Sequence, residues 1–157
     1  MSIQLRKARI PDARGIHQLL LSYARDGIVL PRSLAEIYES IREFFVVEDA
    51  GRVVGICSLT ICWDNLAEVR SLAVLPDRIR QGVGRDLVQA CLAEAATLGI
   101  ARVFALTYQP GFFRKLGFVD IEKSELPQKV WGDCMRCAKF PDCDEWAVVI
   151  DVALMQG

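Results

Sequence analysis

The sequence predicts an α+β (mixed α/β) fold in a single domain, residues 1–157. Two amphipathic helical patterns come early in the chain, a series of β-branched apolar runs follows, and helix and strand patterns then alternate. A chain of 157 residues is long enough to bury a sizeable core. No linker, repeat or low-complexity pattern interrupts it, so we expect one domain.

The N-terminal part of the sequence predicts one strand and two helices. Residues 3–8 are typical of a short strand, and Asp12 is a suitable N-cap for a helix that ends at Gly27. A second helix is predicted over 33–44. It begins with a serine, and Glu36 three residues later completes a capping box.

Strand patterns follow. Residues 45–48 and 53–62 are apolar and rich in β-branched side chains, and the turn residues 49–52 between them favour a hairpin. A third run, 67–74, comes after another turn. We therefore expect three neighbouring antiparallel strands.

A pair of glycines separates the third strand from the next helix. Gly82 and Gly84 lie at the point where a helical pattern begins, and Gly99 is placed to cap the far end of that helix. A buried strand is predicted over 102–107. Because a strand, a helix and a strand follow one another here, we expect a parallel pair with a right-handed crossover.

The remaining sequence predicts three more elements. A short helix is expected over 110–116 and a strand over 117–121. A polar, cysteine-bearing segment comes next, and a last strand is expected over 145–154.

Composition narrows the class of protein. The chain is 52% hydrophobic and 25% charged, with a net charge of −1, which is typical of a globular protein. Nothing in this charge balance favours a nucleic acid or a membrane as partner. Six cysteines without a recognisable export signal favour a reducing compartment, so we expect a cytoplasmic protein.

The glycine pair raises the question of a ligand. A helix start offers unpaired backbone N–H groups and the positive end of the helix dipole, and a glycine lets an anion approach closely. Arg80 and Arg85 flank the pair and favour a phosphate. The alternative is a tight strand-to-helix turn that binds nothing, because the pair matches neither the dinucleotide fingerprint nor the P-loop.

Two stretches give the chain a family resemblance. The segments EVRSLAVLPDRIRQGVGRDLVQACL and FFRKLGF, at this separation, resemble the Gcn5-related N-acetyltransferases, or GNAT family. The resemblance extends over the whole chain in element order. It implies the acyl-CoA N-acyltransferase fold, a mostly antiparallel central sheet with one parallel pair and flanking helices. It also implies acetyl-CoA as cosubstrate.

Three further stretches make the resemblance narrower. The segments LPRSLAEIYESIREF, FALTYQPGFFRKLGF and KSELPQKVWGDCMRCAKFPDCDE look like the acetyltransferase domain of short N-acetylglutamate synthases. This likeness implies acetyl transfer to the α-amine of L-glutamate, the entry to arginine biosynthesis. The acceptor could instead be another amine or a protein N-terminus. A non-catalytic acyl-CoA sensor or a thiol–metal module is the alternative outside the enzymes.

The family resemblance also implies which residues meet acetyl-CoA. They are strand backbone groups, the glycine turn and a ring of the second motif: Leu72, Ala73, Val74, Arg80, Gln81, Gly82, Val83, Gly84, Arg85 and Phe113. The chain departs from the family twice. Ile79 stands where the turn usually has Arg or Gln, and Phe113 stands where many members have a tyrosine that acts as general acid.

Two residues are candidates for proton transfer. Glu68 occupies a strand position where family members often have a carboxylate that acts through water as general base. It could equally be an exposed charge at a strand edge. Tyr108 ends the next strand and is a candidate general acid in place of Phe113, with water as a substitute. It could also be a packed, half-exposed aromatic.

A substrate with two carboxylates needs cationic partners. The resemblance to the synthases points to Arg32 and Lys129, and Arg70 lies on the same predicted strand as Glu68. For each of the three, the alternative is an ordinary solvated surface charge.

The cysteines near the C-terminus have a spacing typical of metal sites. Cys134, Cys137 and Cys143 provide three thiols, whereas a structural zinc site has four ligands. A neighbouring aspartate could complete zinc binding; the alternative is three reduced thiols. We expect no metal. The small-molecule partners are acetyl-CoA and L-glutamate, and whether the chain forms a homodimer stays open.

Overall fold

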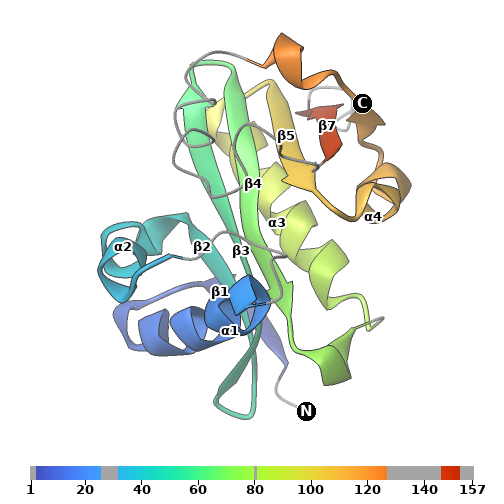
Figure 1. The fold of residues 1–157 in the computed structure, drawn as a ribbon. Coiled ribbons are helices and arrows are strands. Elements are labelled where there is room, and N and C mark those ends of the chain that lie inside the picture. Colours follow the sequence, from blue (N-terminus) through green and yellow to red (C-terminus); the bar gives the residue numbers. More distant parts are fainter. Residues whose placement is uncertain (1–2, 26–31, 80, 127–145, 153–157) are drawn as a thin grey trace. The chain divides into compact units, whose positions relative to one another are not determined.

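The computed structural model describes residues 3–25, 32–79, 81–126 and 146–152. The chain forms two compact units. The first unit comprises Met1–Thr60 and Val69–Glu94, and the second comprises Ile61–Glu68 and Ala95–Gly157. Within the described residues, seven strands pair in the order β1-β2-β3-β4-β5-β7-β6 (Figure 1). The expected mixed fold with helices beside a sheet is confirmed.

The strands of the first unit form an antiparallel ladder. β1 (Gln4–Lys7) pairs with β2 (Phe44–Asp49), and β2 pairs with β3 (Arg52–Trp63). The hairpin between β2 and β3 turns through Ala50 and Gly51, which have φ values of 52° and 81°. Two central residues with positive φ match the twist of the flanking strands, so the predicted hairpin is confirmed.

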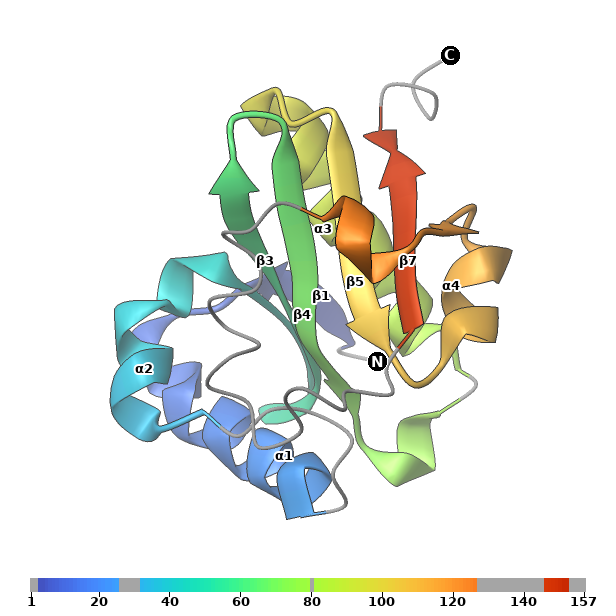
Figure 2. The ribbon, with the colours of Figure 1, turned by 45° about the horizontal axis from the view of Figure 1, so that its top comes forward.

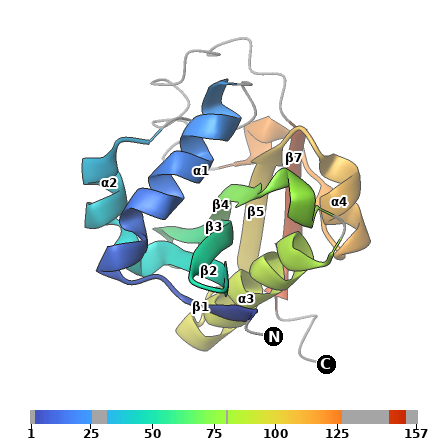
Figure 3. The ribbon, with the colours of Figure 1, turned by 90° about the horizontal axis from the view of Figure 1, so that it is seen from below.

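Two helices lie side by side in the first unit (Figure 3). A 3₁₀ turn, Ile10–Asp12, leads directly into α1 (Ala13–Arg25), and α2 spans Leu34–Glu39. The predicted N-cap is confirmed, because the Ser33 side chain accepts the Glu36 amide at 3.1 Å. The return bond of a capping box, from the Ser33 amide to the Glu36 carboxylate, stays a prediction. The predicted length is wrong: α2 ends before Ser40, and a separate 3₁₀ turn, Ile41–Glu43, follows it.

Asp12 does not cap α1 as the sequence predicts. It ends the 3₁₀ turn, and its carboxylate accepts the Arg9 amide at 2.7 Å. The same carboxylate binds Arg6 through two hydrogen bonds of 2.8 and 3.0 Å, and Arg6 also contacts Glu48 at 2.6 Å. A partly buried ion network therefore joins β1, β2 and the start of α1.

The first unit has its own hydrophobic core. Its members come from α1, α2 and strands β2 to β4, and all are buried: Ala13, Ile16, Leu19, Leu20, Ile37, Phe44, Val46, Ile56 and Ala73. The apolar faces of α1 and α2 are buried in this cluster, which packs both helices against the strands.

β4 (Leu66–Val74) leads through a 3₁₀ turn, Pro76–Arg78, to α3 (Val83–Leu98). Gly99, with φ of 84°, follows the helix and donates to the carbonyl of Ala96, so the predicted C-terminal cap is confirmed. α3 starts in the first unit and ends in the second.

The second unit holds the parallel pair that the sequence predicts. β5 (Arg102–Thr107) runs parallel to the start of β4, from Leu66 opposite Arg102 to Glu68 opposite Phe104. β7 (Trp146–Asp151) runs antiparallel to β5 on its other side (Figure 2). The handedness of the crossover stays a prediction.

α4 (Pro110–Lys115), β6 (Val119–Asp120) and a 3₁₀ turn, Lys123–Glu125, complete the second unit. Both predicted C-terminal strands are shorter than expected in the described residues: β6 has two residues, and β7 ends at Asp151. A separate buried cluster lies in this unit: Leu66, Phe104, Leu126, Ala147 and Val149.

Candidate functional site

The start of α3 forms a tight turn around Gly82. Gly82 has a φ of 82°, a conformation that L side chains rarely adopt. Its carbonyl accepts the Asp86 amide at 3.0 Å, which is the first bond of the helix. The amides of Val83, Gly84 and Arg85 precede that bond, so they belong to the N-terminal donors of a helix, where anions bind.

The space above Gly82 is taken up by an arginine. A Cβ atom at Gly82 would lie 2.8 Å from Arg85 Nη2, so the guanidinium lies directly over this glycine. The Arg85 side chain is 58% exposed and makes a long contact of 3.4 Å with Asp86. The turn therefore combines backbone donors with a solvent-accessible cation. Gln81 is exposed, and Arg80 lies outside the described residues.

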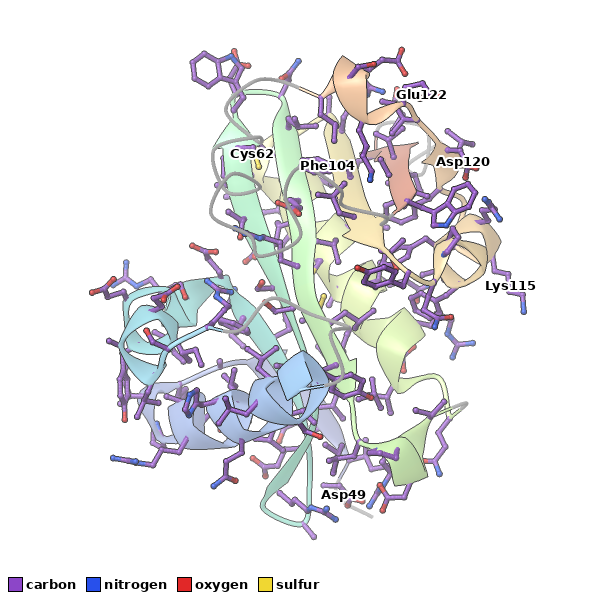
Figure 4. All side chains as sticks on the ribbon, in the orientation of Figure 1. Asp49, Cys62, Phe104, Lys115, Asp120 and Glu122 are labelled. Atoms are coloured by element: carbon purple, nitrogen blue, oxygen red, sulfur yellow. The ribbon has the colours of Figure 1, made fainter. Side chains whose placement is uncertain are left out.

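Two contacts hold this turn and helix against the sheet of the first unit. Arg78, at the end of the 3₁₀ turn, forms a 2.6 Å ion pair with Asp49 at the β2–β3 hairpin (Figure 4). Gly55 on β3 makes room for α3, because a Cβ there would lie 2.7 Å from Val83 Cγ1 and 3.1 Å from Leu87 Cδ1. An ion pair and a close packing contact therefore hold the start of α3 against β2 and β3.

β4 departs from regular strand geometry at Ser71, whose φ is 57°. On either side of this residue the strand is held by backbone contacts. Ser58 on β3 donates to the carbonyl of Arg70 at 3.1 Å, and Tyr23 on α1 donates to the carbonyl of Val74. Of the three predicted backbone-binding residues, Ala73 is buried, and Leu72 and Val74 are half-buried.

Arg32 reaches this irregular part of β4. Its Nη1 donates to Ser71 Oγ at 3.3 Å and its Nη2 donates to Ser40 Oγ at 3.1 Å. The guanidinium also lies over the Phe44 ring, 5.2 Å from its centre. The alternative of a solvated surface charge is therefore wrong for Arg32. Arg70 is half-buried on β4, and Lys129 lies outside the described residues.

Glu68 is a buried carboxylate. It is 9% exposed and lies on β4 in the second unit, directly opposite Phe104 of the parallel strand β5. The alternative of an exposed charge at a strand edge is therefore wrong. Burying a carboxylate costs free energy, and buried ionisable groups are frequent at functional sites. Glu68 is therefore a candidate for a functional role.

The two aromatic candidates of the second unit differ in surroundings. Phe113 on α4 is 4% exposed and packs edge-to-face against Phe112 and Phe118, with both centroid distances 5.1 Å. Its ring is therefore part of a packed aromatic cluster. Tyr108 follows β5 and is half-buried. This burial fits both a general acid and a packed, half-exposed aromatic.

Known proteins resemble this chain in sequence and in structure. Residues 40–120 match the family model described as "Acetyltransferase (GNAT) domain". An uncharacterized N-acetyltransferase of Chlorobaculum tepidum is 44% identical over 145 residues, 92% of this chain and 94% of its own length. An amino-acid acetyltransferase of Mycobacterium tuberculosis is 36% identical over 135 residues, 84% of this chain and 77% of its own.

The chain belongs to the GNAT family. It is an N-acetyltransferase, as its named relatives are. Among solved structures it resembles an N-acetylglutamate synthase of Neisseria gonorrhoeae that was crystallised with coenzyme A and N-acetyl-glutamate. That likeness has a TM-score of 0.87 at 27% identity and covers 97% of this chain but 35% of that one.

Sequence reasoning missed two residues of this N-acetyltransferase. Gly55 lets α3 approach β3, and a lone glycine inside an apolar strand was the available signal for that close contact. Ser71 turns β4 and accepts a bond from Arg32. No sequence signal predicts it, because serine has no preference for positive φ within a strand.

Of the three cysteines among the described residues, Cys57 and Cys91 are core residues and Cys62 is half-buried. Cys57 and Cys91 are fully buried with their sulfur atoms 3.7 Å apart, and burial raises the pKa of the Cys57 thiol well above its ordinary value. No group of three or more potential metal ligands occurs among the residues that the structure describes. Cys134, Cys137 and Cys143 lie outside them. Across the same described ranges, no helix is long and apolar enough to span a membrane.

Proposed function

We propose that this N-acetyltransferase moves the acetyl group of acetyl-CoA to the α-amine of L-glutamate. The observation that carries the proposal is the seating of Arg32, a cation bonded to Ser71 on β4 and to Ser40. An arginine held in this way suits a carboxylate-bearing acceptor, because its planar fork matches the geometry of a carboxylate. Amino-acid acetyltransferases among the relatives support the same choice of acceptor.

The turn at the start of α3 is the proposed site for the pyrophosphate of acetyl-CoA. The amides of Val83, Gly84 and Arg85 supply donors, and the positive φ of Gly82 excludes a side chain from the turn. Arg85 adds an exposed positive charge, and Gln81 and Arg80 complete the proposed set. When bound, the cosubstrate supplies an activated acetyl group as a thioester.

The acceptor glutamate requires a partner for each carboxylate. We assign one carboxylate to Arg32, with Arg70 and Lys129 as the further cations of the proposed pocket. Leaving either carboxylate without a partner in a partly desolvated site would be costly. The three cations therefore favour a dicarboxylate over an acceptor with one carboxylate.

The reaction needs three catalytic roles from this chain: a general base, donors to the thioester oxygen, and a general acid. The amine must lose a proton before its nitrogen bonds to the acetyl carbon, and Glu68 acting through water is the proposed base. The thioester oxygen gains negative charge, and backbone donors of Leu72, Ala73 and Val74 are the proposed partners. The C–S bond then breaks, and Tyr108 or water protonates the departing thiolate, since Phe113 has no proton to give.

This reaction is the first step of arginine biosynthesis, and we propose that role for the chain. The proposal includes a cytoplasmic location and a single acetyltransferase domain over residues 1–157. It involves small-molecule partners and no nucleic acid.

The test is an acceptor panel with acetyl-CoA. Purified protein is incubated with glutamate, glutamine, aspartate, other amino acids and a peptide with a free N-terminus, and products are identified by mass. The proposal expects N-acetylglutamate as the main product. A preference for another amine would replace glutamate as acceptor. Binding of acetyl-CoA without turnover on any amine would favour the non-catalytic sensor.

A further inference from the structure

Ser71 adopts an unusual backbone conformation for its position. Among the described residues, two that are not glycine have positive φ: Ala50 at 52° and Ser71 at 57°. Ala50 lies in a two-residue hairpin turn, where positive φ is required. Ser71 lies inside β4, where no local turn accounts for it. A strained residue within a regular element is a reason to look for a function.

The conformation of Ser71 puts its hydroxyl within reach of Arg32. The Arg32 guanidinium donates to Ser71 Oγ at 3.3 Å, and at its other nitrogen it donates to Ser40 Oγ at 3.1 Å. Successive side chains of a regular strand alternate between its two faces, so a residue in the left-handed region re-aims its side chain. The contact joins the irregular part of β4 to a residue that lies 39 positions earlier in the sequence.

The Arg32 guanidinium also packs against an aromatic ring. The Phe44 ring, which is fully buried, lies beneath it at 5.2 Å. Ser40 itself is anchored, because its hydroxyl donates to the carbonyl of Glu36 at 2.7 Å. Two hydroxyls and an aromatic face therefore limit the rotation of a side chain that is ordinarily among the most flexible.

We propose that Ser71 is a positioning residue that orients Arg32 to receive a carboxylate of the acceptor and so sets acceptor specificity. The proposal rests on the function proposed above. A guanidinium held in place before binding loses less conformational freedom when the carboxylate arrives. The strain at Ser71 is then the cost of that preorganisation, and removing the hydroxyl should weaken acceptor binding without altering the chemical step.

Two substitutions separate the hydroxyl from the backbone strain. Ser71→Ala removes the hydroxyl and keeps the strained φ, whereas Ser71→Gly removes the hydroxyl and relieves the strain. Both should raise KM for glutamate about fivefold to tenfold, as for a lost hydrogen bond to a charged group. We expect kcat and the KM for acetyl-CoA to stay within about twofold of the wild type, and Tm to be higher for Ser71→Gly than for Ser71→Ala. If Ser71 had only a structural role, the KM for glutamate would follow stability instead. Ser71→Gly, the more stable variant, would then have a KM for glutamate close to that of the wild type.

A double-mutant cycle tests whether Ser71 acts through Arg32. In the Arg32→Ala background, Ser71→Ala should have no further effect on the KM for glutamate. Ser58→Ala is the matched control, because this hydroxyl bonds to the Arg70 carbonyl on the same strand and not to Arg32. Additive effects in the cycle, or an equal rise in KM for Ser58→Ala, would overturn the proposal.

The wild-type measurement separates this inference from the proposed function. If the wild type acetylates glutamate and Ser71→Ala leaves its KM unchanged, the inference fails and the function stands. If the wild type prefers another carboxylate-bearing acceptor, the same variants are measured with that acceptor, and the inference is judged on its KM. If the preferred acceptor has no carboxylate, both are overturned.

Discussion

The two units differ in the kind of residue they offer to the proposed reaction. The first unit supplies a glycine turn at a helix start and an arginine held by hydroxyls, features that suit the binding of negative charge. The second unit supplies a buried carboxylate on a strand with a parallel partner. In the proposed function, anion binding depends on irregular backbone in the first unit, and proton transfer depends on the buried carboxylate in the second.

This difference has a physical basis. Binding an anion with backbone N–H groups requires amides that no carbonyl has already taken, and such amides occur at helix starts and turns. A proton acceptor that works on a bound amine must lie where bulk water does not compete, and Glu68 is buried on β4. We therefore expect variants of Arg32 and of the glycine turn to change KM, and variants of Glu68 to change kcat.

The largest effect is expected at Glu68. Glu68→Gln keeps the shape of the side chain and removes the base, so kcat should fall by about a hundredfold or more near neutral pH. The deficit should shrink at high pH, where free amine is abundant. A pH profile of thiol release measures this. An equal loss at every pH would mean that Glu68 has a structural role only.

Removing one partner from the ion network of the first unit should lower its stability. Asp12→Asn breaks a partly buried pair with Arg6, and we expect a loss of about 2 kcal/mol in the free energy of unfolding. Asp120→Asn is the matched control. Asp120 binds Arg114 with equally good geometry, 2.9 and 2.8 Å, but on the exposed surface of the second unit, so little change in Tm is expected.

The acid dependence of stability gives a further check on Asp12. Hydrogen bonding from Arg6 lowers the pKa of Asp12 below its ordinary value of 3.8. The contribution of the pair is therefore fully present above that value and is lost as the pH falls through the lower, folded-state pKa. The difference in stability between wild type and Asp12→Asn, measured by urea unfolding, should narrow below about pH 4. A constant difference would contradict this origin.

Arg32→Ala should raise KM for glutamate by about thirtyfold, which corresponds to about 2 kcal/mol for a lost charged partner. The KM for acetyl-CoA should change little. The preference for glutamate over glutamine should also narrow if Arg32 meets the side-chain carboxylate. Unaltered glutamate kinetics would remove Arg32 from the proposed pocket.

The smallest of these effects is expected at the glycine turn. Gly82→Val puts a β-branched residue at a φ of 82° and a Cβ 2.8 Å from Arg85 Nη2, so it should displace the arginine and distort the turn, and acetyl-CoA should bind about tenfold or more weakly. Calorimetry measures the affinity, and circular dichroism checks that the variant is folded. Gly51→Val, at a hairpin turn with φ of 81° and open space around it, is the matched control for strain alone. Equal affinity in a folded Gly82→Val protein would exclude the phosphate site.

Local signals predicted the turns and caps correctly. The Ser33 N-cap, the turn at Ala50 and Gly51 and the glycine cap at Gly99 all depend on residues within four positions of one another. The parallel pairing of β4 with β5 was also predictable, because the intervening helix permits it. The length of α2 was not, since its helical spacing continues past Ser40 while the chain turns away toward β2.

The sequence by itself determined the order of strands and helices, the family resemblance and the glycine turn, because periodicity, caps and glycine conformations act over a few residues. Only the tertiary structure decided that Glu68 is buried, that Gly55 admits α3, and that Ser71 holds Arg32. Each of these depends on segments distant in sequence meeting in space. A serine or a glutamate carries no sign of such a partner in its neighbours along the chain.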